Sequence, residues 1–125
     1  MNLVKGGFFM NIYDKAHEFA KELKSCPEVV QLRNASKKIE GNETNKKMLE
    51  NFRKLQLQAY TEQIDKGIIS DELKEKMQNI ASIISMNPSV NEYIQAEQRF
   101  AVIWEDIIKI LNDAIGVNLS FGKDK

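Results

Sequence analysis

Apolar residues cover a wide arc of the helix that the sequence predicts from Ser89 to Ile115. Their rows span about 160°, compared with the stripe of about 100° that a surface helix presents to a core. The rows contain Tyr93, Phe100, Ile107 and Ala114; Ile94, Ala101, Ile108 and Ile115; Trp104 and Leu111; and Ala96, Ile103 and Ile110. Such a helix needs two apolar neighbours. The pattern therefore predicts a helix that binds another protein or another copy of the chain.

Four further segments repeat apolar residues at helical spacing, and proline and glycine mark their ends. The first two run from about Asn11 to Lys24 and from about Pro27 to Glu40; a third follows residues 42–44 and runs to Gly67; a fourth extends from Ser70 to before Met86. Ser25 with Glu28 and Ser89 with Glu92 have the spacing of capping boxes, and Ser70 is a predicted N-cap. We expect an all-α fold, a small bundle of about five helices with a long C-terminal helix.

The apolar positions of each helix predict which side chains face the core. In the first helix they are Ile12, Ala16, Phe19, Ala20 and Leu23. In the third they are Met48, Phe52, Leu55, Ala59 and Tyr60. With 125 residues and 42% hydrophobic content, the chain can form one domain without disulfides or metal. We expect this domain to cover residues 10–117.

The two ends of the chain are expected to lie outside that domain. Lys is preferred over Arg, and Asn and Ile are abundant, which is typical of AT-rich codons and indicates a low-GC bacterium. In such codons Lys5-Gly6-Gly7 can be a ribosome-binding site a few codons before Met10, so residues 1–9 are interpreted as a translated leader. A genuine, disordered N-terminal arm is the alternative. Residues 118–125 are expected to fray.

Charge and cysteine content exclude several classes of protein. The 18 basic and 18 acidic residues balance, so no overall field attracts nucleic acid or an anionic membrane. The single cysteine excludes an intramolecular disulfide framework and fits a reducing compartment. No apolar run approaches the roughly 20 residues that span a bilayer, and Lys5-Gly6-Gly7 interrupts the apolar residues that a secretory h-region would need. We expect a soluble, cytoplasmic protein.

Residues suited to catalysis or metal binding are scarce. The only histidine, His17, falls on the polar face of the first helix, and Cys26 has no histidine near it in the sequence. The chain contains no Cys-x-x-Cys, no His-x-x-x-His and no glycine-rich phosphate loop. We therefore predict no catalytic residue, no metal site and no cofactor.

Four lysines flank the predicted turn at Gly41: Lys37, Lys38, Lys46 and Lys47. They could form a weak basic patch, and an RNA-associated factor is the alternative hypothesis for the function. Three glutamates are interleaved with them, however, and no aromatic residue alternates with the lysines. A solvated helix face is favoured, and nucleic acid is not the expected partner.

Three segments of the sequence resemble the YheA branch, the UPF0342 group, of the bacterial YlbF/YmcA family. They are SCPEVV at residues 25–30, FRKLQLQ at residues 52–58 followed by Gly67, and NPSVNEYIQAEQR at residues 87–99. The similarity extends from about Met10 to Val117. The resemblance implies an all-α fold that oligomerises through helices. For the relatives YlbF and YmcA it also implies regulatory roles in competence, sporulation and biofilm formation, through a complex that influences an RNA-cleaving enzyme.

The resemblance also bears on cofactors and on the type of function. The YlbF–YmcA complex is linked to iron–sulfur clusters held by cysteines, but one cysteine cannot supply the four ligands of a cluster within a monomer. We therefore expect a non-catalytic adaptor or regulatory protein that forms a homo-oligomer, with a dimer as the first hypothesis, and that joins a protein partner in a regulatory complex. The candidate interface residues are Tyr93, Phe100, Trp104, Ile108 and Leu111.

Overall fold

Five α-helices make up the computed structural model, which describes residues 7–118 and side chains from residue 11 onward. They are α1 (Gly7–Ser25), α2 (Pro27–Glu40), α3 (Glu43–Lys66), α4 (Asp71–Ser85) and α5 (Pro88–Ile115). The all-α prediction is confirmed, and each predicted helix is present. Of the expected leader and frayed tail, residues 1–6 and 119–125 lie outside the described residues, whereas residues 7–9 belong to α1.

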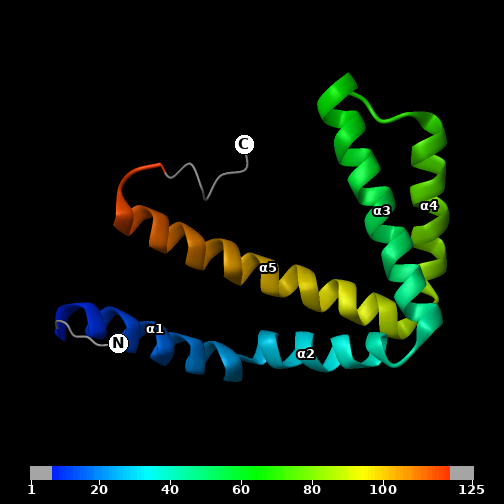
Figure 1. Ribbon diagram of the computed structural model, residues 1–125. Helices are drawn as coiled ribbons and strands as arrows, with labels where there is room; N and C mark the ends of the chain where they lie inside the picture. The colour runs from blue at the N-terminus through cyan, green and yellow to red at the C-terminus, as the bar shows by residue number, and fades with distance from the viewer. Residues whose placement is uncertain (1–6, 119–125) are drawn as a thin grey trace.

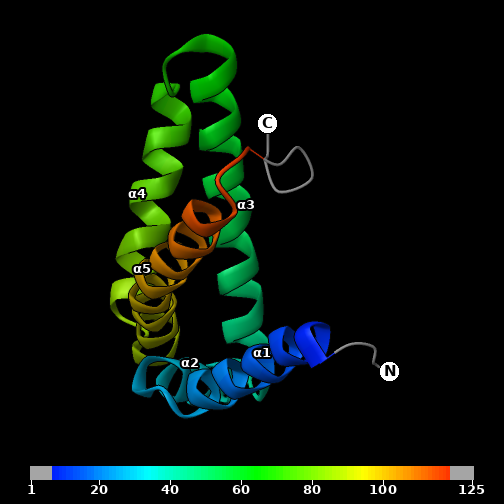
Figure 2. The same cartoon turned by 90° about the vertical axis from the view of Figure 1, so that its left-hand side faces the viewer.

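The helices form two packed pairs that meet at one end (Figures 1 and 2). α2 and α5 lie side by side in opposite directions, and α3 and α4 form a hairpin that extends away from them. α1 extends outward from the N-terminal end of α2. Among the described helices, α1 contacts α2 alone. Three parts of the molecule therefore extend away from the junction: α1, the C-terminal half of α5 and the α3–α4 hairpin.

The hydrophobic core lies at this junction. It contains the buried side chains of α2, α3, α4 and α5, with half-buried neighbours around them. The central residues are Ile39, Leu49, Ile80, Ile84 and Val90, and Met48, Phe52, Leu55, Tyr93 and Ile94 pack against them. Of the inward positions predicted for α3, Met48, Phe52, Leu55 and Ala59 are thus buried or half-buried.

Helix starts at the two prolines differ from the predicted capping boxes. α5 begins at Pro88, and Asn87 is its N-cap: the Asn87 side chain accepts a hydrogen bond from the Val90 N–H at 3.1 Å. Ser89 is inside the helix. At α2 the N-cap is Cys26 instead of Ser25, and it makes no side-chain capping bond. A residue before proline is held in the extended region, which is the backbone conformation of an N-cap, so proline fixes the start one residue before itself.

The other caps agree with the sequence. Ser70 accepts a hydrogen bond from the Leu73 N–H at 3.2 Å, as predicted for the start of α4. Gly67 and Gly116 end α3 and α5 with φ of 75° and 82°, a left-handed conformation that favours glycine.

Three asparagines join the start of α3 to the start of α5. Asn42 caps α3 by accepting a hydrogen bond from the Asn45 N–H at 3.0 Å. The Asn45 side chain is buried, and its Oδ1 accepts a 2.8 Å hydrogen bond from Nδ2 of Asn87. Since Asn87 also caps α5, this polar link fixes the position of the long helix on the core.

Candidate interaction surface

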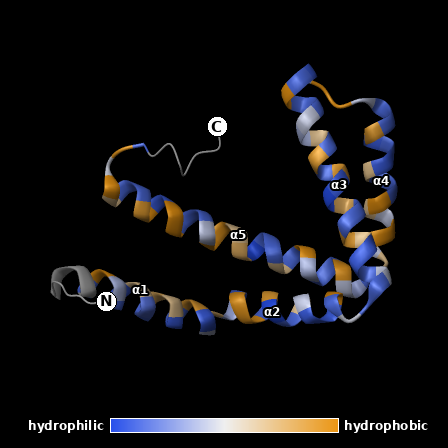
Figure 3. Cartoon of the chain, viewed as in Figure 1, coloured by the Kyte–Doolittle hydropathy of each residue, from blue (hydrophilic) through white to orange (hydrophobic). Residues whose placement is uncertain are grey.

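The two halves of α5 have different surroundings. In the first half Val90 and Ala96 are buried and Tyr93, Ile94 and Phe100 are half-buried. From residue 101 onward no side chain of α5 is buried, although apolar residues continue at the same spacing (Figure 3). The arc that the sequence predicts is therefore present, but this chain buries only its first half, and in the second half only Ile103 and Ile107 are half-buried.

An ion pair marks the point at which α5 leaves the core. Nη2 of Arg53 on α3 donates hydrogen bonds to Oε2 of Glu97 at 2.7 Å and to Oη of Tyr93 at 3.2 Å. The guanidinium carbon also lies 5.6 Å from the centre of the Tyr93 ring. Partial burial lowers the pKa of Arg53, but these hydrogen bonds and the Glu97 charge outweigh it, so the net pKa shift is upward. The contacts show that the α5 face with Tyr93 and Glu97 points toward α3.

The same face of α5 continues beyond Glu97 as an uncovered apolar stripe. At 100° per residue, four large apolar side chains lie within about 40° of Glu97 on the helix surface. We call them the α5 stripe: Trp104, Ile108, Leu111 and Ile115. Trp104 is 44% exposed and Leu111 is 52% exposed. The Phe100 ring stacks on Trp104, with centroids 5.9 Å apart, and links the stripe to the half-buried part of the helix.

A shallow groove runs beside this stripe. It has a volume of about 520 Å³ and is lined by Trp104, Glu105, Ile108, Lys109, Asn112 and Asp113. Its apolar side is formed by the indole and the Ile108 side chain, and its charged side by the back of α5. An apolar floor beside charged groups is the arrangement of a protein interface, with an apolar centre and a polar rim.

The apolar side of α1 is uncovered too. All side chains from residue 11 to residue 22 are exposed, including Ile12 at 57% and Phe19 at 44%. The prediction that Ile12, Ala16, Phe19 and Ala20 face the core of this chain is therefore wrong; only Leu23 of that set is half-buried. The physical reason is that α1 extends past the end of α2 and meets neither α5 nor the hairpin.

A second surface, which the sequence analysis missed, lies on α3. Leu57, Tyr60 and Ile64 are each exposed by more than half and lie within about 40° of Arg53 on the helix. They therefore continue the face of α3 that contacts α5 at Arg53. The prediction that Tyr60 faces the core is wrong. The helical spacing of residues 53, 57, 60 and 64 is the sequence signal for this exposed face. The signal was missed because Tyr60 was assigned to the face of α3 that packs on the core.

The five candidate interface residues separate into two groups. Tyr93 packs on the core and bonds within its own chain, and Phe100 is half-buried. Trp104, Ile108 and Leu111 are exposed together on the C-terminal half of α5. Trp104, Ile108 and Leu111 thus form one continuous exposed surface, whereas Tyr93 makes its contacts within its own chain.

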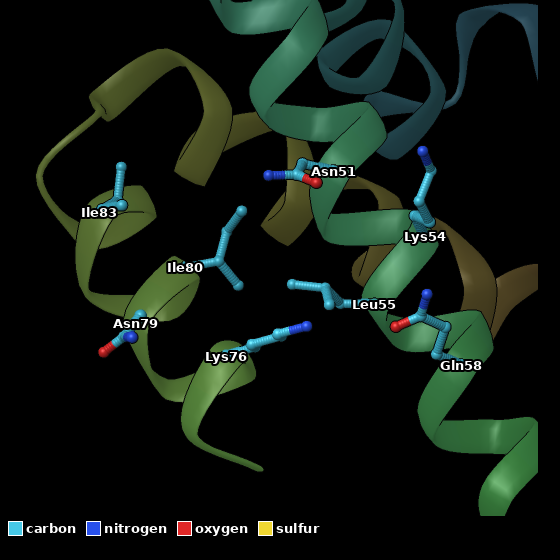
Figure 4. A pocket seen from close by; sticks show the side chains of 8 residues that line it. All are labelled: Asn51, Lys54, Leu55, Gln58, Lys76, Asn79, Ile80 and Ile83. Atoms are coloured by element: carbon cyan, nitrogen blue, oxygen red, sulfur yellow. The ribbon is translucent and has the colours of Figure 1, made fainter. Parts of the chain in front are cut away.

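A seam between α3 and α4 forms another groove, with a volume of about 380 Å³ (Figure 4). Leu55 and Ile80 point toward each other across it, and Lys76 extends from α4 toward α3. Lys54 and Lys76 are the charged side chains that line it, and Lys76 already pairs with Glu72 at 3.6 Å. The seam separates two helices of one hairpin and holds no acid, base or thiol beyond these lysines.

The four lysines near Gly41 lie at the end of α2 and the start of α3. Nζ of Lys38 pairs with Oε1 of Glu92 on α5 at 3.1 Å, and Lys46 is half-buried. Lys37 and Lys47 are exposed. One of the four positive charges is therefore already paired with a carboxylate of α5.

Cys26 and His17 are the two residues whose catalytic potential the sequence raised. The Cys26 thiol donates a hydrogen bond to Oε1 of Glu28 at 3.2 Å, and this bond lowers the pKa of Glu28. His17 is exposed on α1. Across the described residues, no three His, Cys, Asp or Glu side chains come together as a metal site would require. None of the described helices is long and apolar enough to cross a bilayer.

Comparison with known proteins gives a consistent result. The family described as "Control of competence regulator ComK, YlbF/YmcA" matches residues 12–116. A UPF0342 protein of Clostridium tetani is 58% identical over 116 residues, which are 93% of this chain and 100% of the relative. A UPF0342 protein of Clostridium novyi is 57% identical over 106 residues, 85% of this chain and 93% of the relative.

A solved structure shares the fold. It is a chain of the crystal structure of Bacillus subtilis RicA in complex with RicF, with a TM-score of 0.54 and 19% sequence identity. The alignment covers 85% of this chain and 94% of that chain. At this level of identity the similarity concerns the arrangement of the helices.

Proposed function

This chain belongs to the UPF0342 group of the YlbF/YmcA family, and we propose that it is a non-catalytic adaptor that self-associates through the C-terminal half of α5. In this proposal the oligomer takes part in a regulatory protein complex in the cytoplasm. The family description, control of the regulator ComK, supports a regulatory role. The neighbour in fold, crystallised as RicA in complex with RicF, supports a function through protein–protein contacts.

The observation that carries the proposal is the exposed α5 stripe. Trp104, Ile108 and Leu111 are large apolar side chains at helical spacing, and they continue an arc that is buried in the first half of the same helix. Tryptophan is among the residues most enriched at the energetic centres of interfaces. Contiguous exposed apolar surface of this kind marks an interaction site in a soluble protein.

Sedimentation of the purified chain tests self-association. We expect a dimer at tens of micromolar, and a strict monomer at that concentration would contradict the proposal. Leu111→Lys should raise the dissociation constant by about 100-fold or more, because a symmetric dimer loses two apolar contacts worth about 1.5–3 kcal/mol each.

A matched control is available on the opposite side of the same helix. Val102 is 60% exposed, as open as Leu111, but lies about 140° from Glu97 around α5, on the charged side. Val102→Lys should leave the dissociation constant within about twofold of the original, since an exposed substitution away from an interface has an effect near zero. Equal weakening by both variants would show that the stripe has no special role.

A further inference from the structure

α1 has little support from the part of its own chain that the structure describes. It contacts α2 and no other described helix, and its side chains from residue 11 to residue 22 are all exposed. Helices of about this length are marginal in water by themselves, and most of their stability in proteins comes from packing of an apolar face. The apolar face of α1 therefore needs a surface that residues 11–118 of its own chain do not provide.

The α5 stripe has the dimensions of the missing surface. Ile12, Ala16, Phe19 and Leu23 on α1 follow the spacing i, i+4, i+7, i+11, and we call them the α1 stripe. The α5 stripe, from Trp104 to Ile115, follows the same spacing. Each stripe is about 16 Å long at 1.5 Å per residue. Two helices with apolar rows of equal length can pack along their whole stripes.

We propose that α1 of one copy packs on the α5 stripe of a second copy, and that the second copy returns the same contact. This inference rests on the self-association proposed above and specifies its geometry. Among the described residues of one chain α1 and α5 make no backbone contact, whereas a twofold exchange covers both stripes of both copies at once. A different protein would have to supply two separate apolar surfaces to achieve the same coverage.

The exposed area of the chain matches what such a dimer needs. A compact monomer of 14.4 kDa exposes about 6,800 Å². This chain exposes 9565 Å². If the residues outside the described range are counted as fully exposed chain, an excess on the order of 1,000 Å² still remains. A standard interface buries about 800 Å² on each partner, so one reciprocal interface accounts for the excess.

Disulfide trapping between two differently labelled chains tests the exchange. In a Cys26→Ser background, one chain carries Phe19→Cys and the other carries a single cysteine at position 104, 108, 111 or 115, so that every disulfide is intermolecular. After mixing and mild oxidation, at least one stripe position should give about tenfold more mixed dimer than Val102→Cys, because bonding requires Cα atoms within about 7 Å.

The outcomes separate this inference from the proposed function. Suppose that sedimentation shows a dimer, but that no cysteine of the α5 stripe forms more disulfide with Phe19→Cys than Val102→Cys does. This result overturns the exchange of α1 but leaves self-association standing. A dimer in which Leu111→Cys chains bond best to each other also overturns it, because α5 would then pack on α5. A strict monomer overturns both proposals.

A second pair of variants avoids cysteine chemistry. Phe19→Lys should raise the dimer dissociation constant by at least about tenfold, because it places a charge in the proposed contact. His17 lies on the opposite side of α1 and is also exposed in the single chain, so His17→Lys should have no effect. If Phe19→Lys dimerises as tightly as His17→Lys, the α1 stripe is not part of the interface.

Discussion

The first and second halves of α5 carry similar apolar patterns but lie in different environments. Val90 and Ala96 have exposed fractions of 0% and 1%, whereas no α5 side chain beyond Phe100 is buried. The first half meets α2, α3 and α4 at the junction, and the second half extends past all three. The comparison teaches that an apolar row identifies the face that must be covered, while the path of the chain decides whether the cover is internal or external.

The largest effect on stability is expected from a substitution in the buried first half of α5. Val90→Asp would place an unpaired carboxylate in the core, a change that costs more than about 4 kcal/mol and is comparable to the whole stability of a small domain. Val102→Asp makes the same replacement on the exposed side of the same helix and should change the unfolding free energy by less than about 0.5 kcal/mol. Thermal unfolding followed by circular dichroism measures both; similar melting temperatures would contradict the assigned burial.

A smaller effect is expected from the polar link that holds the first half in place. Asn87→Ala removes the cap of α5 and leaves Oδ1 of the buried Asn45 without its partner, for a combined cost of about 2–4 kcal/mol. Asn112→Ala, in the exposed half, should stay within about 0.5 kcal/mol of the original protein. Urea unfolding of the two variants checks this, and an Asn87→Ala protein as stable as Asn112→Ala would remove the structural role of the link.

The smallest effect concerns the boundary between the halves. The Arg53 and Glu97 side chains are 48% and 45% exposed, so their ion pair should contribute about 0.2–1 kcal/mol and weaken with salt. A double-mutant cycle with Arg53→Met and Glu97→Gln measures this coupling at low and high salt. A coupling energy of several kcal/mol would mean that the pair is far less accessible to solvent than the structure shows.

Much of the fold was predictable from periodicity and from proline and glycine. The approximate ranges of α2 to α5, the Ser70 cap and the ends at Gly67 and Gly116 follow from local sequence, because caps and left-handed glycines are local requirements, whereas α1 begins at Gly7, four residues before the predicted start. The Asn45–Asn87 bond was not predictable, since it joins residues 42 positions apart in the sequence. The exposure of α1 was missed for a similar reason: its amphipathic pattern is the same whether the covering surface belongs to its own chain or to another.

The candidate surface was predictable in part. Sequence alone placed Trp104, Ile108 and Leu111 on one face of α5, and the structure leaves all three exposed. It could not assign Tyr93 to the core, because that depends on Arg53 of α3 being opposite it. The exposed face at Leu57 and Ile64 was missed because α3 has apolar residues on two sides, and only the packed hairpin shows which side is inner.

Fluorescence of Trp104, the only tryptophan, tests most directly whether a second chain covers the C-terminal half of α5. In the single chain Trp104 is 44% exposed, so water reaches the indole and its emission lies further to the red than that of a covered indole. If self-association covers it, emission should be blue-shifted at tens of micromolar and should move to the red on dilution, over the concentration range in which sedimentation shows the dimer dissociating. A red-shifted emission maximum that does not change with concentration would contradict the account.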